Sequence, residues 1–239
     1  GDVVSDRLRP VVLPLVYGAA FACLLRILDQ LTLNAAWITA AEYAALLAGT
    51  VIGLWLAPRW KSDQTAPLWA SVWLALIVAA FPLGILTSLE ISAYVSTVAT
   101  VAFFRAALIA VAVIPLGIAT ALCSAQAGIG KGCLSIPTVV CFAVSFVAAR
   151  WLAISFFGPV PVLVALVWVL VVVGMIPLLQ KLRTREFGNQ RAIIGATSFA
   201  VVAGLATPFW MTQYTPERSA RLLSVSYTHL RAHETTSYL

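Results

Sequence analysis

The stretch Val162–Leu179, VLVALVWVLVVVGMIPLL, decides the fold class of this chain. It contains eighteen residues without a charge, and Gln180 and the basic segment KLRTREFGNQR follow it at once. At 1.5 Å per residue, a helix of this length spans about 27 Å, close to the roughly 30 Å hydrocarbon core of a bilayer. The stretch therefore predicts a membrane-spanning helix rather than a buried helix of a soluble domain.

The composition of the whole chain agrees with this interpretation. Hydrophobic residues make up 62% of the 239 residues and charged residues 10%, whereas a soluble domain carries about 25% charged residues. The apolar residues come in long runs and do not alternate with polar ones, which argues against a transmembrane β-barrel. The fold class predicted is all-α, a polytopic transmembrane helix bundle.

The apolar runs predict about seven spans. Their expected ranges are Pro10–Leu31, Trp37–Ala57, Leu68–Leu89, Val95–Cys123, Leu134–Phe157, Val162–Leu179 and Ala192–Trp210. Pro115 is expected to kink the fourth, and the segment 158–161 is expected to form a tight turn before the sixth. A cleaved signal peptide is the alternative for the first span, because a basic start precedes its apolar run.

The two ends of the chain differ from this core in composition. Residues 1–9 are expected to be a cytoplasmic N-terminal segment, 10–210 the transmembrane domain, and 211–224 the start of a truncated juxtamembrane linker. Residues 225–239, VSYTHLRAHETTSYL, resemble a translated sequencing adapter, and we interpret them as an artefactual tail. Both histidines of the chain lie there, so we expect no metal site.

The distribution of Lys and Arg over the loops predicts the orientation. Nine of these residues fall in alternate segments: Arg7, Arg9, Arg59, Lys61, Lys131, Lys181, Arg183, Arg185 and Arg191. The three intervening loops contain none. Cytoplasmic loops carry the excess of Lys and Arg, which predicts a protein of the cell (inner) membrane with a cytoplasmic N-terminus. Arg218 and Arg221 would then lie outside, unless a further span follows.

Five charged residues fall inside the expected spans, where each costs about 2.5–3.5 kcal/mol at the bilayer centre. They are Arg26, Asp29, Glu42, Arg105 and Arg150. The first four form our candidate intramembrane polar site. Arg26 and Asp29 share one helix face, and Arg105 could meet Asp29 or Glu42 across a helix interface. Structural pairing between helices, or snorkelling of the long side chains to the headgroups, is the alternative. Arg150 has no obvious partner.

The remaining motifs argue mainly against nucleotide, metal, cofactor and nucleic-acid sites. Gly49 and Gly53 form a GxxxG pattern, which fits either packing within the chain or dimerisation. The loop GIGKG lacks the spacing and the Ser or Thr of a phosphate-binding loop. Four cysteines without a CxxC pair suggest small membrane-buried residues. We find no catalytic motif, cofactor-binding motif or metal site, and the positive charge sits beside apolar runs, so no nucleic-acid partner is expected.

Four segments carry a resemblance to a known family: YGAAFACLLRILDQL from Tyr17, LLAGTVIGLWLAPRW from Leu46, LIAVAVIPLGIATALCSA from Leu108 and YTPERSARLL from Tyr214. They resemble the membrane domain of fused spermidine-synthase-like proteins, whose helices look like those of the major facilitator superfamily. The loop SAQAGIGKGCLS departs from the family, because it lacks the usual Tyr-Asn-Thr entry to the fifth span.

The resemblance implies a membrane module that is normally joined to a Rossmann-like aminopropyltransferase or methyltransferase-type domain. Any such catalytic domain would lie beyond this chain. We therefore expect the N-terminal membrane part of a spermidine-synthase-like protein, whose partners are the lipid bilayer and a small polar or cationic solute bound at Asp29, Glu42 and Arg105. The alternatives are a stand-alone transporter-class protein and a non-catalytic structural or assembly subunit.

Overall fold

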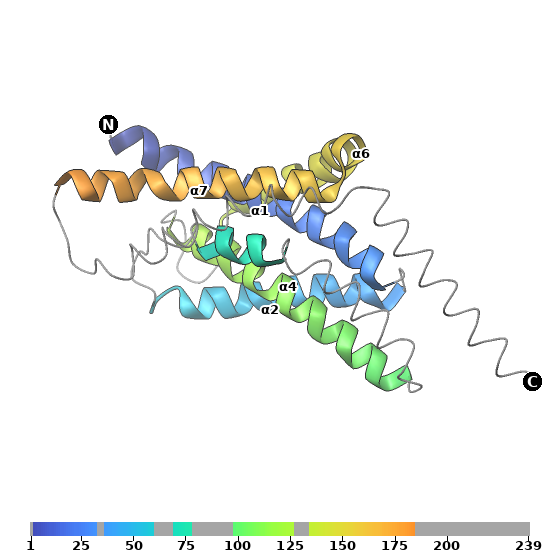
Figure 1. Ribbon diagram of the computed structural model, residues 1–239. Helices are drawn as coiled ribbons and strands as arrows, with labels where there is room; N and C mark the ends of the chain where they lie inside the picture. Colours follow the sequence, from blue (N-terminus) through green and yellow to red (C-terminus); the bar gives the residue numbers. More distant parts are fainter. Residues whose placement is uncertain (1, 33–35, 60–68, 78–97, 127–133, 185–239) are drawn as a thin grey trace, which may run out of the picture.

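The computed structural model describes residues 2–32, 36–59, 69–77, 98–126 and 134–184, and these are almost entirely helical, with no strand among them (Figure 1). The helices are α1 (Asp2–Thr32), α2 (Ala36–Leu56), α4 (Val98–Gln126), α5 (Ile136–Ala148), α6 (Ile154–Phe157) and α7 (Pro159–Thr184). A π-helical turn, η1 (Ala149–Ala153), joins α5 to α6, and residues 69–77 form a further short helix. The all-α fold class is confirmed.

Four described helices are long and apolar enough to cross a membrane. Their apolar parts are Pro10–Asp29, Trp37–Leu56, Ala102–Ala125 and Ile136–Phe157, which match the first, second, fourth and fifth predicted spans. The described apolar part of α7 is shorter, Pro159–Gly174, although the helix runs on to Thr184. Lys181 and Arg183 therefore belong to the end of α7 and not to a loop after it. The predicted third span is described only at 69–77, and the seventh lies outside the described residues.

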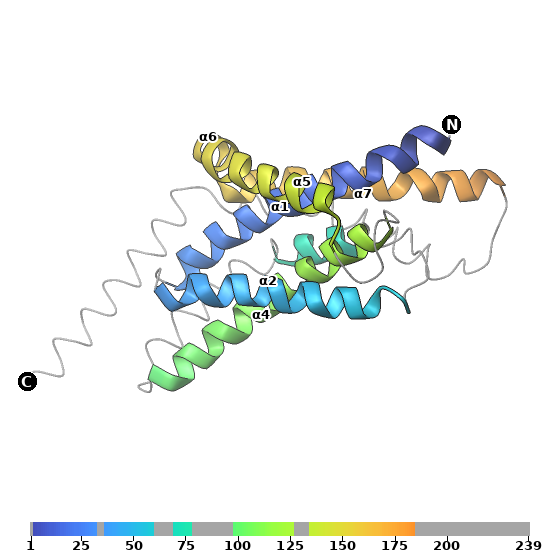
Figure 2. The same cartoon turned by 180° about the vertical axis from the view of Figure 1, so that it is seen from behind.

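α1 is the central helix of the bundle. It packs against α5 on one side and against α7 and α4 on others (Figures 1 and 2). Of its apolar stretch Pro10–Asp29, 72% is buried inside the protein, compared with 6% of Ile136–Phe157. Lipid covers an apolar helix face as well as protein does. A helix at the centre of a transmembrane bundle should therefore be buried by protein, and a helix at its outer edge should have most of its surface facing lipid.

An aromatic cluster fixes α1 against its neighbours. The ring of Phe21 lies 5.7 Å from that of Tyr43 on α2 in an edge-to-face arrangement. On the α5 side its centroid lies 6.0 Å from Phe142 and 5.5 Å from Phe146. These separations lie in the range in which aromatic pairs attract. Phe21 thus ties together three helices at one level of the bundle.

Glycines allow α2 and α4 to approach closely. A Cβ on Gly117 of α4 would lie 2.5 Å from the carbonyl oxygen of Leu46 and 2.8 Å from the backbone nitrogen of Thr50, both on α2. A Cβ on Gly53 would lie 2.8 Å from the carbonyl oxygen of Ile118, and one on Gly49 would collide with that of Ile114. The GxxxG pattern of α2 therefore serves packing within the chain, against α4.

The segment 134–157 begins and ends with clear local signals. The Ser135 hydroxyl accepts a hydrogen bond from the backbone N–H of Thr138 and caps α5. At the far end Gly158 has φ +82°, and its N–H donates to the carbonyl of Ile154 at 2.9 Å. Pro159 then starts α7 at once, where its missing N–H costs nothing. The expected four-residue turn at 158–161 is therefore wrong: the reversal is confined to Gly158.

The ends of α1, α2, α4 and α7 form two groups, one at each end of the bundle (Figure 1). The beginning of α1, which contains Arg7 and Arg9, lies at the same end of the bundle as the finish of α7, which contains Lys181 and Arg183. The end of α2, which leads to Arg59, lies there too. Within the part of the chain that the structure describes, the basic segments predicted to share one side of the membrane thus share one end of the bundle.

Candidate intramembrane charge site

Glu42 is buried because of its position on α2. The buried residues of this helix are Ile38, Glu42, Ala45, Gly49 and Gly53, spaced three or four apart as on one helix face. This is the face that Gly49 and Gly53 press against α4. A side chain at position 42 must therefore point into the bundle, and only 1% of the Glu42 surface is exposed.

The Glu42 carboxyl is incompletely satisfied. Its Oε1 atom is buried and has no hydrogen-bond partner among the described residues. A carboxylate without partners is among the most costly groups to remove from water. Such a group is retained in a membrane protein mainly where it binds something or moves a charge.

Two other charged groups act on Glu42 electrostatically. Asp29, near the end of α1, has the stronger effect, and Arg150, on the π turn η1, has the weaker one. The site is thus assembled from α1, α2 and η1, at the end of the bundle where α1 finishes and α2 begins (Figure 1).

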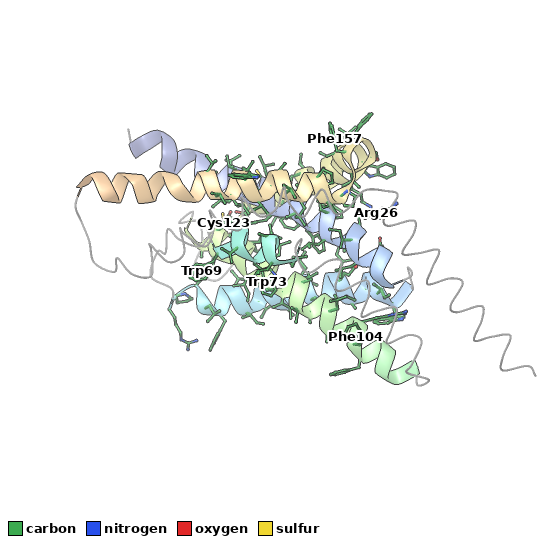
Figure 3. All side chains as sticks on the ribbon, viewed as in Figure 1. Arg26, Trp69, Trp73, Phe104, Cys123 and Phe157 are labelled. Carbon is green, nitrogen blue, oxygen red and sulfur yellow. The ribbon has the colours of Figure 1, made fainter. Side chains whose placement is uncertain are left out.

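The other two predicted site residues lie differently. Arg26 is exposed, while Leu24, Leu25, Ile27 and Leu28 beside it are buried, and Figure 3 shows it near the end of the bundle where Phe157 of α6 lies. Arg105 is half-buried on α4. The expectation that Arg105 meets Asp29 or Glu42 across a helix interface stays a prediction, and Arg150 lies on η1, which contacts α1.

The π turn is the feature that the sequence did not reveal. The run Ala148-Ala149-Arg150-Trp151 has no glycine or proline that would signal a break in the helix. A π turn inserts an extra residue into a helix and is often found at functional sites. Here it includes Arg150, and η1 contacts α1. The sequence contains no sign of where Arg150 would lie, because its position depends on how α5 and η1 pack against α1.

The hydroxyl groups of the described residues serve the backbone. Thr50 donates to the carbonyl of Leu46, Thr120 to that of Leu116 and Ser145 to that of Phe142. Ser124 accepts from the backbone N–H of Ser135 at 2.6 Å. Such bonds within and between helices position the chain. The charge site combines the acidic side chains of Glu42 and Asp29 with one guanidinium, that of Arg150, a composition suited to binding positive charge.

The cysteines behave as the composition suggests. Cys23 and Cys123 are buried, and Cys141 is half-buried. Cys133 lies outside the described residues.

Comparison of the chain with protein-family models, curated proteins and solved structures gave no significant match.

Proposed function

We propose that this chain is an integral membrane module that binds one positively charged group of a small solute at Glu42 and Asp29. The observation that carries the proposal is the burial of Glu42 with an unpartnered carboxylate oxygen, next to a second acid. An alkylammonium group supplies both the charge and the hydrogen-bond donors that this oxygen lacks. Arg150 offsets part of the negative charge.

The wider assignment follows from the sequence. We propose that the chain is the N-terminal membrane part of a spermidine-synthase-like protein, with seven spans and a cytoplasmic N-terminus in the cell (inner) membrane. The four resembling segments and the grouping of basic residues at one end of the bundle support it. A solute with an ammonium group is consistent with that resemblance, because spermidine synthesis uses amines.

The test is binding and uptake of radiolabelled putrescine by the purified protein in liposomes. We expect saturable binding that unlabelled putrescine competes away and the uncharged 1,4-butanediol does not. Glu42→Gln should weaken binding at least about tenfold, the loss expected for a charge-assisted hydrogen bond. Asp29→Asn should weaken it less. Asp6→Asn is the matched control. Asp6 lies on α1 like Asp29 but near the opposite end of the helix, so this substitution should leave putrescine binding unchanged. Equal binding by the wild-type protein and Glu42→Gln would remove Glu42 from the site.

A second candidate function is purely structural, and the close packing of α2 on α4 favours it. Gly49, Gly53 and Gly117 bring the two backbones into contact, as in membrane subunits that only anchor or assemble. In that case no amine would bind, and Glu42 would contribute to stability. A stand-alone transporter differs from both in its gene, which would encode further spans and no Gly-rich strand–turn–helix segment with acidic residues.

A further inference from the structure

The outer surface of the segment 136–157 carries one charged residue, Arg150. Val144, Val147 and Trp151 are exposed on this surface, and their spacing of three and four residues places them on one helix face. Arg150, which precedes Trp151, is exposed as well. Figure 2 shows α5 in front of α1, on the outside of the bundle. A charged side chain therefore lies in a surface that lipid tails would otherwise cover.

The position of Arg150 along the helix is deep within the predicted span. The apolar stretch Ile136–Phe157 contains 22 residues, or about 33 Å of helix, close to the roughly 30 Å of the hydrocarbon core. Arg150 is seven positions before Phe157, so its Cα lies about 10 Å inside the nearer end. Side chains of a helix lean toward its N-terminus, which tilts the Cα–Cβ bond of Arg150 away from the nearer surface. Snorkelling to that surface is therefore hindered.

The helices near Arg150 in the sequence provide no acid to neutralise it. No Asp or Glu occurs between Glu90 and Glu186, so α4, α5 and α7 contain none. The described acids at this end of the bundle are Asp29 on α1 and Glu42 on α2. Arg150 acts on Glu42 electrostatically, but Glu42 is buried inside the bundle whereas the Arg150 side chain is exposed on its outside. The exposed guanidinium therefore requires an anion from its surroundings.

We propose that Arg150 binds the phosphate group of a phospholipid, which is drawn inward along the outer face of α5 so that the bilayer is thinner beside η1. A guanidinium and a phosphate form paired, charge-assisted hydrogen bonds. The exposed aliphatic residues on the N-terminal side of Arg150 suit the acyl chains of that lipid, which a free phosphate ion lacks. Trp151 is a residue type found at the level of the headgroups. Local thinning is one way in which a bilayer accommodates an arginine at this depth. Amine binding at Glu42 is not required for this contact.

The first test uses phosphatidylglycerol that carries a photoactivatable diazirine in one acyl chain, with the full chain in mild detergent. We expect saturable labelling of the segment 136–157, located by mass spectrometry. Unlabelled dioleoylphosphatidylglycerol should compete about tenfold better than dioleoylglycerol, which has the same chains without the phosphate, because one charge-assisted contact is lost. An excess of sodium phosphate should not compete. Equal competition by the two lipids, or competition by sodium phosphate, would overturn the proposal.

Variants at position 150 assign the preference for phosphate to the guanidinium. Arg150→Leu should make the two lipids compete equally, whereas Arg150→Lys keeps the charge and should retain most of the preference. Arg59→Leu removes an exposed arginine that follows the end of α2 and should leave the preference unchanged. If Arg150→Leu keeps the full preference while remaining folded by circular dichroism, Arg150 does not bind the phosphate.

Bilayer thickness tests the inward displacement of the lipid. The proteins are placed in bilayers of dimyristoleoyl, dioleoyl and dierucoyl phosphatidylcholine, whose thickness increases in this order, and their thermal unfolding midpoints are measured. Relative to Arg150→Leu, the wild-type midpoint should fall by about 2–4 °C across the series, because a thicker bilayer must be thinned further. Arg59→Leu should follow the wild type, since phosphates already lie at that level. A constant difference between the wild type and Arg150→Leu at all three thicknesses would contradict the thinning.

Discussion

At the scale of single residues, Glu42 is the clearest case of a polar group whose burial should cost free energy. Its side chain is almost fully enclosed, and one carboxylate oxygen has no hydrogen-bond partner among the described residues. Asp29 adds like charge, and Arg150 is exposed on the π turn. A residue selected for stability alone would be expected to have its hydrogen bonds satisfied. Glu42 therefore resembles a functional group that the surrounding packing holds in place.

This view predicts the effect of Glu42→Gln on stability. The substitution keeps the shape of the side chain and removes a charge from the interior of the bundle. We expect it to stabilise the protein by about 1 kcal/mol, a fraction of the insertion cost of an intramembrane charge. The measurement is the midpoint of unfolding when dodecyl sulfate is added to protein in mild detergent.

The structural alternative predicts the opposite sign. If Glu42 holds the helices together through Arg150, its replacement by Gln should lower the same midpoint, because a buried charge pair would be broken. Leu47→Ala, at an exposed position of α2, is the control and should change the midpoint little. A fall in the midpoint for Glu42→Gln together with unchanged putrescine binding would favour the structural function.

At the scale of the elements, the contact between α2 and α4 depends on the absence of a side chain at Gly117. A methyl group there would meet backbone atoms of Leu46, Gly49 and Thr50, and backbone cannot rotate away as a side chain can. We expect Gly117→Ala to destabilise the protein by about 1–3 kcal/mol, a typical cost of overpacking, although Ala is the better helix former.

The control for this prediction adds bulk where α4 is exposed. Ala107→Val enlarges a side chain on the outer surface of the same helix and should leave the unfolding midpoint within about 0.5 kcal/mol of the wild type. Equal midpoints for Gly117→Ala and the wild-type protein would mean that α2 and α4 are farther apart than the structure has them.

The π turn gives a second prediction at this scale. Deleting Ala153 should convert η1 into a regular helical turn, because a π turn contains one residue more than an α-helix needs. The residues on either side would keep their faces toward α1, so we expect a stability change of about 1 kcal/mol or less. The unfolding midpoint in detergent measures it.

A deletion in the regular part of the same helix should behave differently. Removing Ala143 turns every following residue by about 100° around the helix axis. Phe146 would then leave its ring contact with Phe21, and we expect a loss of about 3 kcal/mol or more. Equal losses for the two deletions would show that η1 does not contain an extra residue.

At the scale of the whole molecule, the features predicted correctly from the sequence are those set by local composition. Long apolar runs gave the helical class and the approximate limits of four spans, because crossing a bilayer requires a minimum length of apolar helix. The relative rotation of the helices could not be predicted. It decides that Glu42 faces inward, that Arg26 is exposed and that Gly49 and Gly53 meet α4 rather than another copy of the chain.

The features of the charge site that could not be predicted from the sequence depend on contacts between segments far apart in the chain. Arg150 acts on Glu42 from 108 positions further along the chain, and only the crossing of α5 over α1 brings the two near each other. The π turn likewise has no glycine, proline or other composition that marks it within its own segment.

The central claim is that these helices cross a bilayer, with the basic ends on one side. The most direct measurement is labelling of single cysteines by a membrane-impermeant maleimide in cells, after the native cysteines have been replaced by alanine. Trp37→Cys, at the start of α2, should be labelled in intact cells, whereas Arg59→Cys, after its end, should be labelled only once the membrane is opened. Labelling of both positions to the same extent in intact cells would contradict the account.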